Sequence, residues 1–419
     1  MVQTISADEF RDMVDAARRG EREFALVDTR PEESYEGWRI AGAINYVYKP
    51  FHRFDREEFE TATGLGPEET VVTVCAKGKS SHALADDLAA AGYDDVYAID
   101  DGMRGWSAVY DRVEVPLPDA GDDPLDIVQI QRRAKGCLGY LVVGGEGDDG
   151  SRVAVAVDVS RHGEEWRAAA AARDASIAAV LDTHVHADHL SGGRALADEL
   201  GVPYVLPAAV ADRDVAYDFD AIGRNETLSV GGIDVKALAT PGHTDDMASY
   251  LVGGSAVLTG DTLFTGGVGR TELQFAADEG GEEGDRDEGS ERESAGARTG
   301  AERLYDSLHG TLLAEPDDVA VLPGHFAVAN DGTADATPGE PVATTVGEAR
   351  REIGILRRDR EAFVEEITAT LPEKPPNYES VIAANRGVEP PADEVAAIDL
   401  EMGPNRCAAE PAPEPEAGD

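Results

Sequence analysis

The chain has 419 residues, more than one typical domain holds, so two folded units are expected. Acidic residues outnumber basic ones by 83 to 37, and the resulting net charge of −46 repels nucleic acid and anionic lipid. We therefore expect no nucleic-acid partner and no membrane partner. Concentrated salt screens self-repulsion of this kind, so the acidic, lysine-poor composition favours a halophilic, haloarchaeal source.

Cysteine content and hydropathy indicate the compartment. Three cysteines, Cys75, Cys137 and Cys407, are too few for a disulfide framework. The N-terminus has no apolar stretch, and no run reaches the roughly 18 apolar residues that span a bilayer. We expect a soluble protein in a reducing cytoplasm.

Residues 1–115 alternate short apolar runs with a helical pattern. FALVDTR (24–30), TVVTVCA (70–76) and VYAID (96–100) are typical of buried strands, and SSHALADDLAAAGY (80–93) is typical of a helix that ends at Gly92. This rhythm predicts an α/β domain, a parallel sheet flanked by helices. The Pro-, Gly- and Asp-rich segment 116–124 predicts a linker.

Residues 125–390 mix strands and helices in a way that predicts a second α/β unit, a sandwich. The expected strands are 126–132, 139–143, 153–159, 177–186, 204–207, 233–240, 249–254 and 256–261, with an Ala-rich helix at 166–173. Residues 277–300 are acidic and of low complexity, which predicts a disordered insertion. For the same reason, we expect residues 391–419 to form an acidic disordered tail.

Four strand ends in this second unit carry metal-ligand residues. THVHADHLSGG (183–193) follows a strand, and PGHT, TGD and PGH each follow another. Neutral imidazole and carboxylate are the groups that Zn(II), Fe(II) and Mn(II) accept. A lone histidine is more often structural, but this order and spacing of ligand types is specific. The candidate ligands are His184, His186, Asp188, His189, His243, Asp261 and His325.

Two metal arrangements are compatible with these residues. His184, His186 and His243 could hold one ion and Asp188, His189 and His325 another, with Asp261 bridging them, so that a bridging hydroxide attacks a thioester. Alternatively, His184, His243 and Asp261 alone could hold one Fe(II), leaving open positions for dioxygen and a sulfur substrate. The residues alone leave both arrangements open.

From residue 125 to about 388 the chain resembles the persulfide dioxygenases of the metallo-β-lactamase superfamily, in THVHADHLSGG, PGHTDDMASYLV, TGDTLFTGGVGRTEL, AERLYDSLHGTLL and LPEKPPNYESVIAANRGVE. The resemblance implies an αββα sandwich and one Fe(II) per chain on His184, His243 and Asp261. The other four candidates would serve a second site or surround the first, and Arg270 would shape the pocket. Two Zn(II) or a mixed Fe/Zn pair is the alternative cofactor set. The sequence departs from the family at PGHF, where many members have Asp-Tyr after the final histidine.

Residues 1–115 resemble a rhodanese-like sulfurtransferase domain, in LVDTRPEESYEGWRIAGAIN, CAKGKSS and DDGMRGW. The resemblance implies that Cys75 is the catalytic thiol, in a loop whose backbone N–H groups and following helix N-terminus lower its pKa. Asp28 and Arg30 would shape this region. The alternative is a structural cysteine in an inactive domain. The loop residues are Ala76, Lys77, Gly78, Lys79, Ser80 and Ser81.

Together these resemblances predict a sulfur-metabolism enzyme. Its metal site would oxidise a small thiol persulfide with O2 to sulfite and thiol, and Cys75 would transfer sulfane sulfur, with sulfite and thiosulfate as further partners. The runner-up is a dinuclear hydroxyacyl-thioester hydrolase similar to glyoxalase II. A third, non-enzymatic interpretation is a sulfur carrier or redox sensor. The family also suggests a homo-oligomer.

Overall fold

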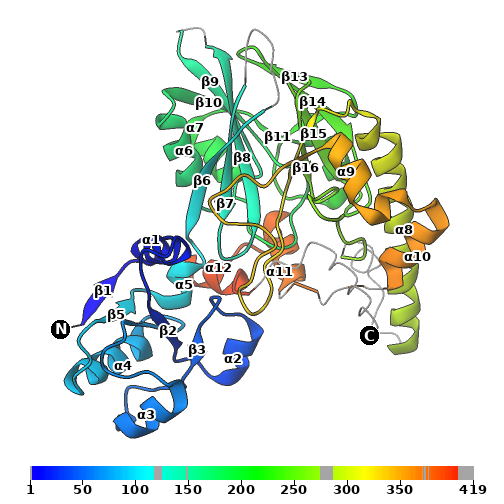
Figure 1. The fold of residues 1–419 in the computed structure, drawn as a ribbon. Helices are drawn as coiled ribbons and strands as arrows, with labels where there is room; N and C mark the ends of the chain where they lie inside the picture. Colours follow the sequence, from blue (N-terminus) through cyan, green and yellow to red (C-terminus); the bar gives the residue numbers. More distant parts are fainter. Residues whose placement is uncertain are drawn as a thin grey trace.

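The computed structural model describes residues 2–117, 125–147, 150–273, 286–369, 371, 374–375 and 377–403. Two domains follow one another along the chain, the first in blue and cyan at the bottom of Figure 1 and the second above it. Among the described residues, no helix is both long enough and apolar enough to cross a membrane.

The first domain is a parallel sheet with helices on both faces. Its five strands have the order β1-β5-β4-β2-β3. Val72 and Val74 pack on one face with α1 and α5, and Val71 packs on the other with α3 and α4, as the two-residue period of a strand requires. The elements are β1 (Gln3–Ile5), α1 (Ala7–Arg18), β2 (Ala25–Asp28), α2 (Glu32–Gly37), β3 (Ile44–Asn45), α3 (Arg56–Thr63), β4 (Val71–Val74), α4 (Lys79–Ala90), β5 (Val96–Ile99) and α5 (Gly102–Trp106).

The second domain contains two mixed sheets. One has seven strands in the order β12-β11-β10-β9-β8-β7-β6, and the other has six in the order β13-β14-β15-β16-β17-β18. The strands are β6 (Tyr110–Val115), β7 (Asp126–Arg132), β8 (Cys137–Glu146), β9 (Arg152–Val157), β10 (Ala175–Leu181), β11 (Tyr204–Pro207), β12 (Asp220–Ile222), β13 (Thr227–Val230), β14 (Ile233–Ala239), β15 (Ala248–Val252), β16 (Ala256–Gly260), β17 (Ala320–Pro323) and β18 (Thr344–Thr345).

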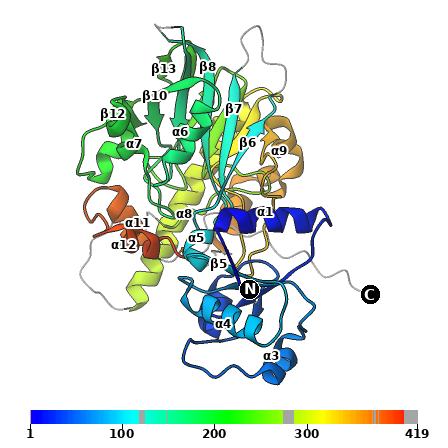
Figure 2. The same cartoon turned by 90° about the vertical axis from the view of Figure 1, so that its left-hand side faces the viewer.

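Helices cover the outer faces of these sheets and complete an αββα sandwich (Figures 1 and 2). The central core lies between the sheets and joins Ile127 and Tyr140 of one to Tyr250 and Leu322 of the other. The expected fold class is therefore confirmed. The helices are α6 (Glu164–Ala171), α7 (Gly193–Leu200), η1 (Ala208–Arg213), α8 (Arg286–Gly310), η2 (Leu312–Ala314), α9 (Val346–Glu352), η3 (Gly354–Arg357), α10 (Arg360–Ala369), α11 (Tyr378–Asn385) and α12 (Glu394–Leu400).

The domain boundary lies earlier than the sequence analysis places it. Strand β6 pairs antiparallel with β7 over its whole length and so belongs to the sheet of the second domain, although the predicted first domain ran to residue 115. The alternating burial of β6 does not reveal which sheet it joins, because that choice depends on its long-range partner. Most of the predicted linker, residues 118–124, lies outside the described residues.

Two segments predicted to be disordered contain helices. Residues 286–300, assigned to the acidic insertion, form the first part of α8; this helix continues into the buried Ala301, Leu304 and Leu308. Residues 394–400, assigned to the tail, form α12, and the helix is followed by its C-cap residue, the buried Glu401. In both segments packing against the rest of the chain outweighs an acidic composition. Residues 274–285 and 404–419 lie outside the described residues.

Candidate metal centre

The candidate ligands come together from both sheets. The loop that carries His184 to His189 follows β10 of the seven-stranded sheet, whereas His243, Asp261 and His325 follow β14, β16 and β17 of the other. All seven candidate side chains are at most 4% exposed. The two sheets therefore bring side chains more than 130 residues apart to one end of the sandwich.

The turn before His243 requires a glycine at position 242. Gly242 has φ +149°, and a Cβ there would meet Leu304 Cα of α8 at 2.5 Å. Only glycine allows the chain to pass this close to the helix while it presents His243 inward.

Three atoms form an open donor set. His243 Nε2 lies 3.4 Å from Asp261 Oδ2, and His184 Nε2 lies 4.0 Å from the same oxygen. Within the described residues, all three atoms are buried and have no hydrogen-bond partner. Buried polar atoms are nearly always paired, so three unpaired atoms facing one point indicate a metal position, and the donor set fits a transition-metal ion.

The other polar atom of each of these side chains is held by the protein. His243 Nδ1 donates to the backbone oxygen of Arg270 at 2.8 Å, and His184 Nδ1 lies 3.0 Å from the hydroxyl of Thr183. His325 Nδ1 donates to Asp261 Oδ1 at 2.6 Å. Contacts of this kind fix the tautomer and orientation of metal ligands.

Burial also sets the protonation of this group. It lowers the pKa of His184 well below the usual histidine value, which favours the neutral imidazole that binds metals. Burial alone would raise the pKa of Asp261, but the adjacent imidazoles of His325, His243 and His184 outweigh it and keep this carboxylate ionised.

The remaining candidate ligands belong to separate groups. His189 Nδ1 and His325 Nε2 both pair with Asp188, at 3.1 and 2.7 Å. The His186 ring lies 4.2 Å from that of His189 and 4.3 Å from that of His184, between centroids, and its Nε2 is 3.3 Å from Asp158 Oδ1. Neither of its ring nitrogens has a hydrogen-bond partner among the described residues. The structure therefore separates the seven candidates into groups and does not give them one common contact.

Cys137 belongs to the Asp188 group, which the sequence analysis missed. Its Sγ donates to Asp188 Oδ2 at 3.3 Å. Burial and the charge of Asp188 raise the pKa of this thiol, but hydrogen bonds from His189 and His325 outweigh them and bring it to about 7. The sequence analysis gave Cys137 no role in a site, because its contact with Asp188 spans 51 residues and leaves no local pattern.

The C-terminal helices hold the metal-ligand loop in place. The Asn385 amide donates to the backbone oxygens of His186 and His189, both at 2.8 Å, and accepts from the amide of Ser191 at 2.9 Å. Glu401 Oε1 accepts from the amide of Leu190 at 2.9 Å. Asn385 lies in the ANRG part of a motif that supported the family resemblance, so the sequence contained a pattern that could have identified it as a site residue. Glu401 lies in no such motif.

Glu401 also joins the two domains. It pairs with both terminal nitrogens of Arg132 at 2.9 and 3.1 Å, and Arg132 Nε donates to the backbone oxygen of Ser107, just after α5. Asp399 pairs with Arg104 of α5 at 2.5 Å. Helices α11 and α12 accordingly lie between the first domain and the metal-ligand loop (Figures 1 and 2).

The Cys75 loop follows β4 and leads into α4 as the resemblance implied. Ser81 Oγ donates to Cys75 Sγ at 3.4 Å. Burial raises the pKa of this thiol, but hydrogen bonds from the hydroxyl and amide of Ser81, the amide of Lys77 and the hydroxyl of Ser80 outweigh it and lower the pKa. The side chains of Lys77 and Lys79 are exposed, while Gly78 is the buried N-cap of α4.

Asp28 and Arg30 pair with each other at the end of β2. Arg30 donates to Asp28 Oδ2 and to the backbone oxygen of Trp38, both at 2.6 Å. These contacts give Asp28 and Arg30 a structural role in the strand-end loop. Arg270 is similarly buried and paired with Glu272, and its backbone oxygen orients His243.

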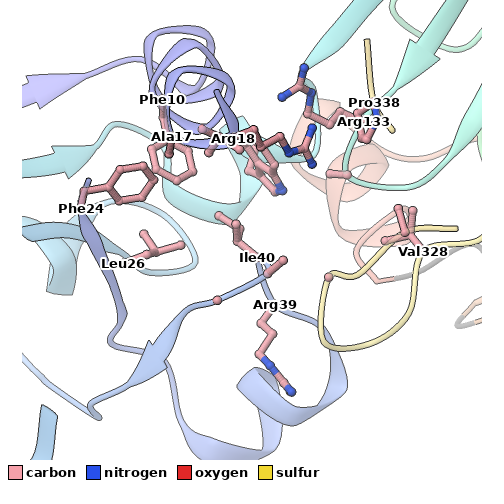
Figure 3. Close-up of a pocket in the computed structure, with 17 residues that line it drawn as sticks. Phe10, Ala17, Arg18, Phe24, Leu26, Arg39, Ile40, Arg133, Val328 and Pro338 are labelled. Carbon is pink, nitrogen blue, oxygen red and sulfur yellow. The ribbon is translucent and has the colours of Figure 1, made fainter. Parts of the chain in front are cut away.

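A separate cavity of about 400 Å³ lies between the domains (Figure 3). Phe10, Phe24 and Trp106 line it from the first domain, and Arg133 and Val328 from the second. None of the candidate ligands and no residue of the Cys75 loop is among its lining residues, so it is distinct from both sites.

Comparison with known families gives two matches. Residues 6–109 match the rhodanese-like domain, and residues 139–325 match the metallo-beta-lactamase superfamily. A cytoplasmic hydroxyacylglutathione hydrolase of Arabidopsis thaliana is 33% identical over 218 residues, which cover 50% of this chain and 72% of the relative. Four other hydroxyacylglutathione hydrolases also match this chain, and each match covers between 35% and 50% of the length of that relative.

Two solved structures are also similar. A metallo-beta-lactamase from Staphylococcus aureus is 22% identical with a TM-score of 0.51, and the match covers 62% of this chain and 72% of that one. ETHE1 from Myxococcus xanthus is 28% identical with a TM-score of 0.48, covering 62% of this chain and 97% of that one. The similarity to the Staphylococcus aureus structure supports the αββα fold of the second domain.

Proposed function

The chain belongs to the metallo-β-lactamase superfamily and carries an N-terminal rhodanese-like domain, and from this premise we propose that it oxidises a small thiol persulfide with O2. The products are sulfite and the free thiol. The reaction balances as RSSH + O2 + H2O giving RSH, sulfite and two protons, with the terminal sulfur oxidised and O2 reduced.

One observation carries this proposal. His184, His243 and Asp261 direct three unpaired atoms to one point, while Asp188, His189 and His325 are hydrogen-bonded among themselves. Two histidines and one carboxylate with open positions are the donor set of non-haem Fe(II) oxygenases. A ferrous ion bound there would supply the redox chemistry that joins dioxygen to sulfur.

The rest of the chain prepares this site. Arg270 and Thr183 fix the outward nitrogens of His243 and His184, so both Nε2 atoms remain available. Burial of all three ligands excludes bulk water, which favours a defined geometry over hydrolytic side reactions. Asn385 and Glu401 hold the adjacent loop rigid.

Cys75 is the sulfur-transfer residue of the same pathway. Its stabilised thiolate attacks the terminal sulfur of a persulfide, and the thiol leaves as its thiolate. Sulfite then attacks the terminal sulfur of the Cys75 persulfide, the S–S bond breaks, and thiosulfate leaves while Cys75 is restored. The first domain thus consumes the product of the second.

Hydrolysis of a hydroxyacyl thioester is the second candidate. The Arabidopsis relative, named a hydroxyacylglutathione hydrolase, favours it at 33% identity over 72% of its length. This reaction uses two metals and an activated water. The ligand atoms of Asp188, His189 and His325 form a group separate from those of His184, His243 and Asp261, and this separation weighs against a shared dinuclear site.

Both activities are tested on one preparation, purified without oxygen in high salt. We expect oxygen uptake that depends on glutathione persulfide and little hydrolysis of S-lactoylglutathione. Rapid thioester hydrolysis with no persulfide-dependent oxygen uptake would overturn the proposal and establish the second candidate. A Cys75→Ser variant is expected to keep oxygen uptake and to lose thiosulfate formation.

A further inference from the structure

We propose that the cavity between the two domains binds a small aromatic carboxylate. Its volume of about 400 Å³ falls within the range of pockets that hold small molecules in proteins. The first domain lines it with α1, β2 and α5, and the second with the residues around Arg133 and Val328 (Figure 3). The proposal goes beyond the oxidation and does not rest on it, because neither the metal ligands nor the Cys75 loop line this cavity.

Three aromatic rings give the cavity a wall of defined shape. The Phe10 ring packs edge-on against the rings of Phe24 and Trp106, with centroid distances of 5.7 and 5.4 Å. Each ring is therefore held by a neighbour before any ligand binds. Ile40 and Val328 add aliphatic side chains from the two domains. A planar aromatic body that enters the cavity leaves water and packs against these groups.

The lining differs in charge from the chain as a whole. Acidic residues number 83 of 419 and outnumber the 37 basic ones. Of the 17 described residues that line the cavity, three are arginines and none is acidic. The cavity therefore favours an anionic ligand over a cationic one.

Two of the three arginines are occupied by contacts within the protein. Arg133 is buried and pairs with Asp15 at 2.7 Å and with Asp111 at 2.8 Å, so its charge is balanced. Arg39 lies over the ring of Tyr35 and points away from the cavity (Figure 3). Neither guanidinium is therefore the main group for binding an anion.

Arg18, in the last turn of α1, is the third arginine and the one we assign to the carboxylate. Its side chain is 45% exposed, and its ion-pair partner among the described residues is Asp15 Oδ1 at 3.7 Å, an oxygen that Arg133 already binds at 2.7 Å. A separation of 3.7 Å is too long for a hydrogen bond, so the N–H groups of Arg18 are able to donate to a ligand. One guanidinium binds a carboxylate through two parallel hydrogen bonds, which also orients the ligand.

Trp106 supplies a second donor. The residue is only 7% exposed, yet its indole N–H has no hydrogen-bond partner among the described residues. Buried tryptophan N–H groups usually have a partner, as Trp166 has in the backbone oxygen of Tyr140 at 3.0 Å. A carboxylate oxygen in the cavity would provide the missing acceptor. An aromatic carboxylate thus matches both the apolar wall and the available donors.

Contacts between the domains hold the cavity on two sides. The pair of Arg133 and Asp15 joins the turn before β8 to α1. On the other side, the amide of Arg39 donates to the backbone oxygen of Asn330 at 2.9 Å, and a Cβ on Gly332 would lie 2.4 Å from the backbone oxygen of Arg39. The site is therefore formed before the ligand arrives, which lowers the entropic cost of binding.

The test titrates 2-naphthoate into the full-length protein by calorimetry in constant high salt. The neutral 2-naphthamide, which has the same rings, is the comparison ligand. We expect one equivalent of 2-naphthoate to bind, at least about tenfold more tightly than the amide, because hydrogen bonds to a charged group are the stronger ones. Arg18→Gln is expected to weaken 2-naphthoate by about tenfold and to leave the amide within about twofold.

Two further variants locate the binding. Arg19→Gln changes the neighbouring arginine, which pairs with Glu21 and does not line the cavity, so it should alter neither affinity. Ala17→Trp fills the cavity from α1 and should prevent binding of both ligands. The proposal is overturned if 2-naphthoate does not bind saturably, if both ligands bind equally, or if Ala17→Trp leaves binding unchanged. Binding is measured without oxygen uptake, so its failure leaves the proposed reaction standing, and the converse also holds.

Discussion

The metal centre and the Cys75 loop both lie at strand ends, but they are built in opposite ways. The metal centre gathers side chains from four loops and both sheets, and the facing atoms of His184, His243 and Asp261 have no hydrogen-bond partner among the described residues. The Cys75 loop surrounds one sulfur with amides and hydroxyls from the residues that directly follow it. The first site depends on tertiary packing, the second on local backbone geometry.

This difference predicts how each site responds to change. A substitution far along the chain can disturb the metal centre, because Asn385 and Glu401 hold its loop from the C-terminal helices. The Cys75 loop should respond mainly to its own residues. The following variants test that contrast, from the largest expected effect to the smallest.

Asp261→Asn should abolish the metal centre while sparing the thiol. It removes the charge from the shared oxygen and the support of His325, so the loss of metal affinity should exceed the roughly 10–100-fold typical of supporting residues. Metal analysis and oxygen uptake measure this loss. Sulfur transfer by Cys75 from thiosulfate to cyanide is expected to stay within about twofold of wild type; a parallel collapse of both activities would contradict the contrast.

Glu401→Gln should destabilise the protein by about 3–5 kcal/mol, because it leaves Arg132 buried without its partner. Denaturant unfolding in constant high salt measures this free energy. The exposed Glu394→Gln on the same helix is the matched control and should cost about 0.5 kcal/mol or less. Equal effects of the two variants would show that the buried pair has no special role.

The Glu401 contribution also depends on pH. Burial alone would raise the pKa of Glu401, but Arg132, Lys135 and Arg161 hold it well below the usual value. Because the folded pKa is depressed, this stability is fully present above the unfolded value of about 4.3 and is lost as pH falls through the folded pKa. The difference between wild type and Glu401→Gln should therefore shrink below about pH 4; a difference that grows there would contradict the assignment.

Asn385→Ala should weaken metal binding by about 10–100-fold, since it frees the backbone of His186, His189 and Ser191. Competition with a chelator measures the affinity. Ser380→Ala, exposed on the same helix, should leave it unchanged. If both variants bind metal like wild type, the C-terminal helices do not position the loop.

Ser81→Ala should have the smallest effect, an increase in the pKa of Cys75 with no change in metal content. The variant removes the hydroxyl that donates to the sulfur. The pH dependence of alkylation by iodoacetamide is expected to move to higher pH, whereas the exposed Ser34→Ala should leave it in place. An unshifted profile would mean that backbone amides alone stabilise the thiolate.

Much of this arrangement could be predicted from the sequence, because its signals are local. Strand periodicity located β4, β7 and β10, and ligand spacing located the seven candidates. The missed features are long-range contacts between residues that carry no pattern of their own. Cys137 meets Asp188 across 51 positions, and Arg132 meets Glu401 across 269. The acidic composition led to a wrong prediction of disorder in these segments, because buried ion pairs and helix packing outweigh the repulsion between the charges.

The halophilic source, the cytoplasmic location and the homo-oligomer stay predictions. The acidic composition predicts that the unfolding free energy rises with salt concentration, because counterions screen a net charge of −46.

The most direct test of the central claim is the ratio of oxygen consumed to sulfite formed by the iron-loaded full-length protein with a persulfide substrate. The Cys75→Ser variant is used, so that no sulfite is diverted to thiosulfate. The proposed reaction predicts about one iron per chain, one O2 consumed per sulfite formed, and no uptake after Asp261→Asn. Iron bound at that level without persulfide-dependent oxygen uptake would contradict it.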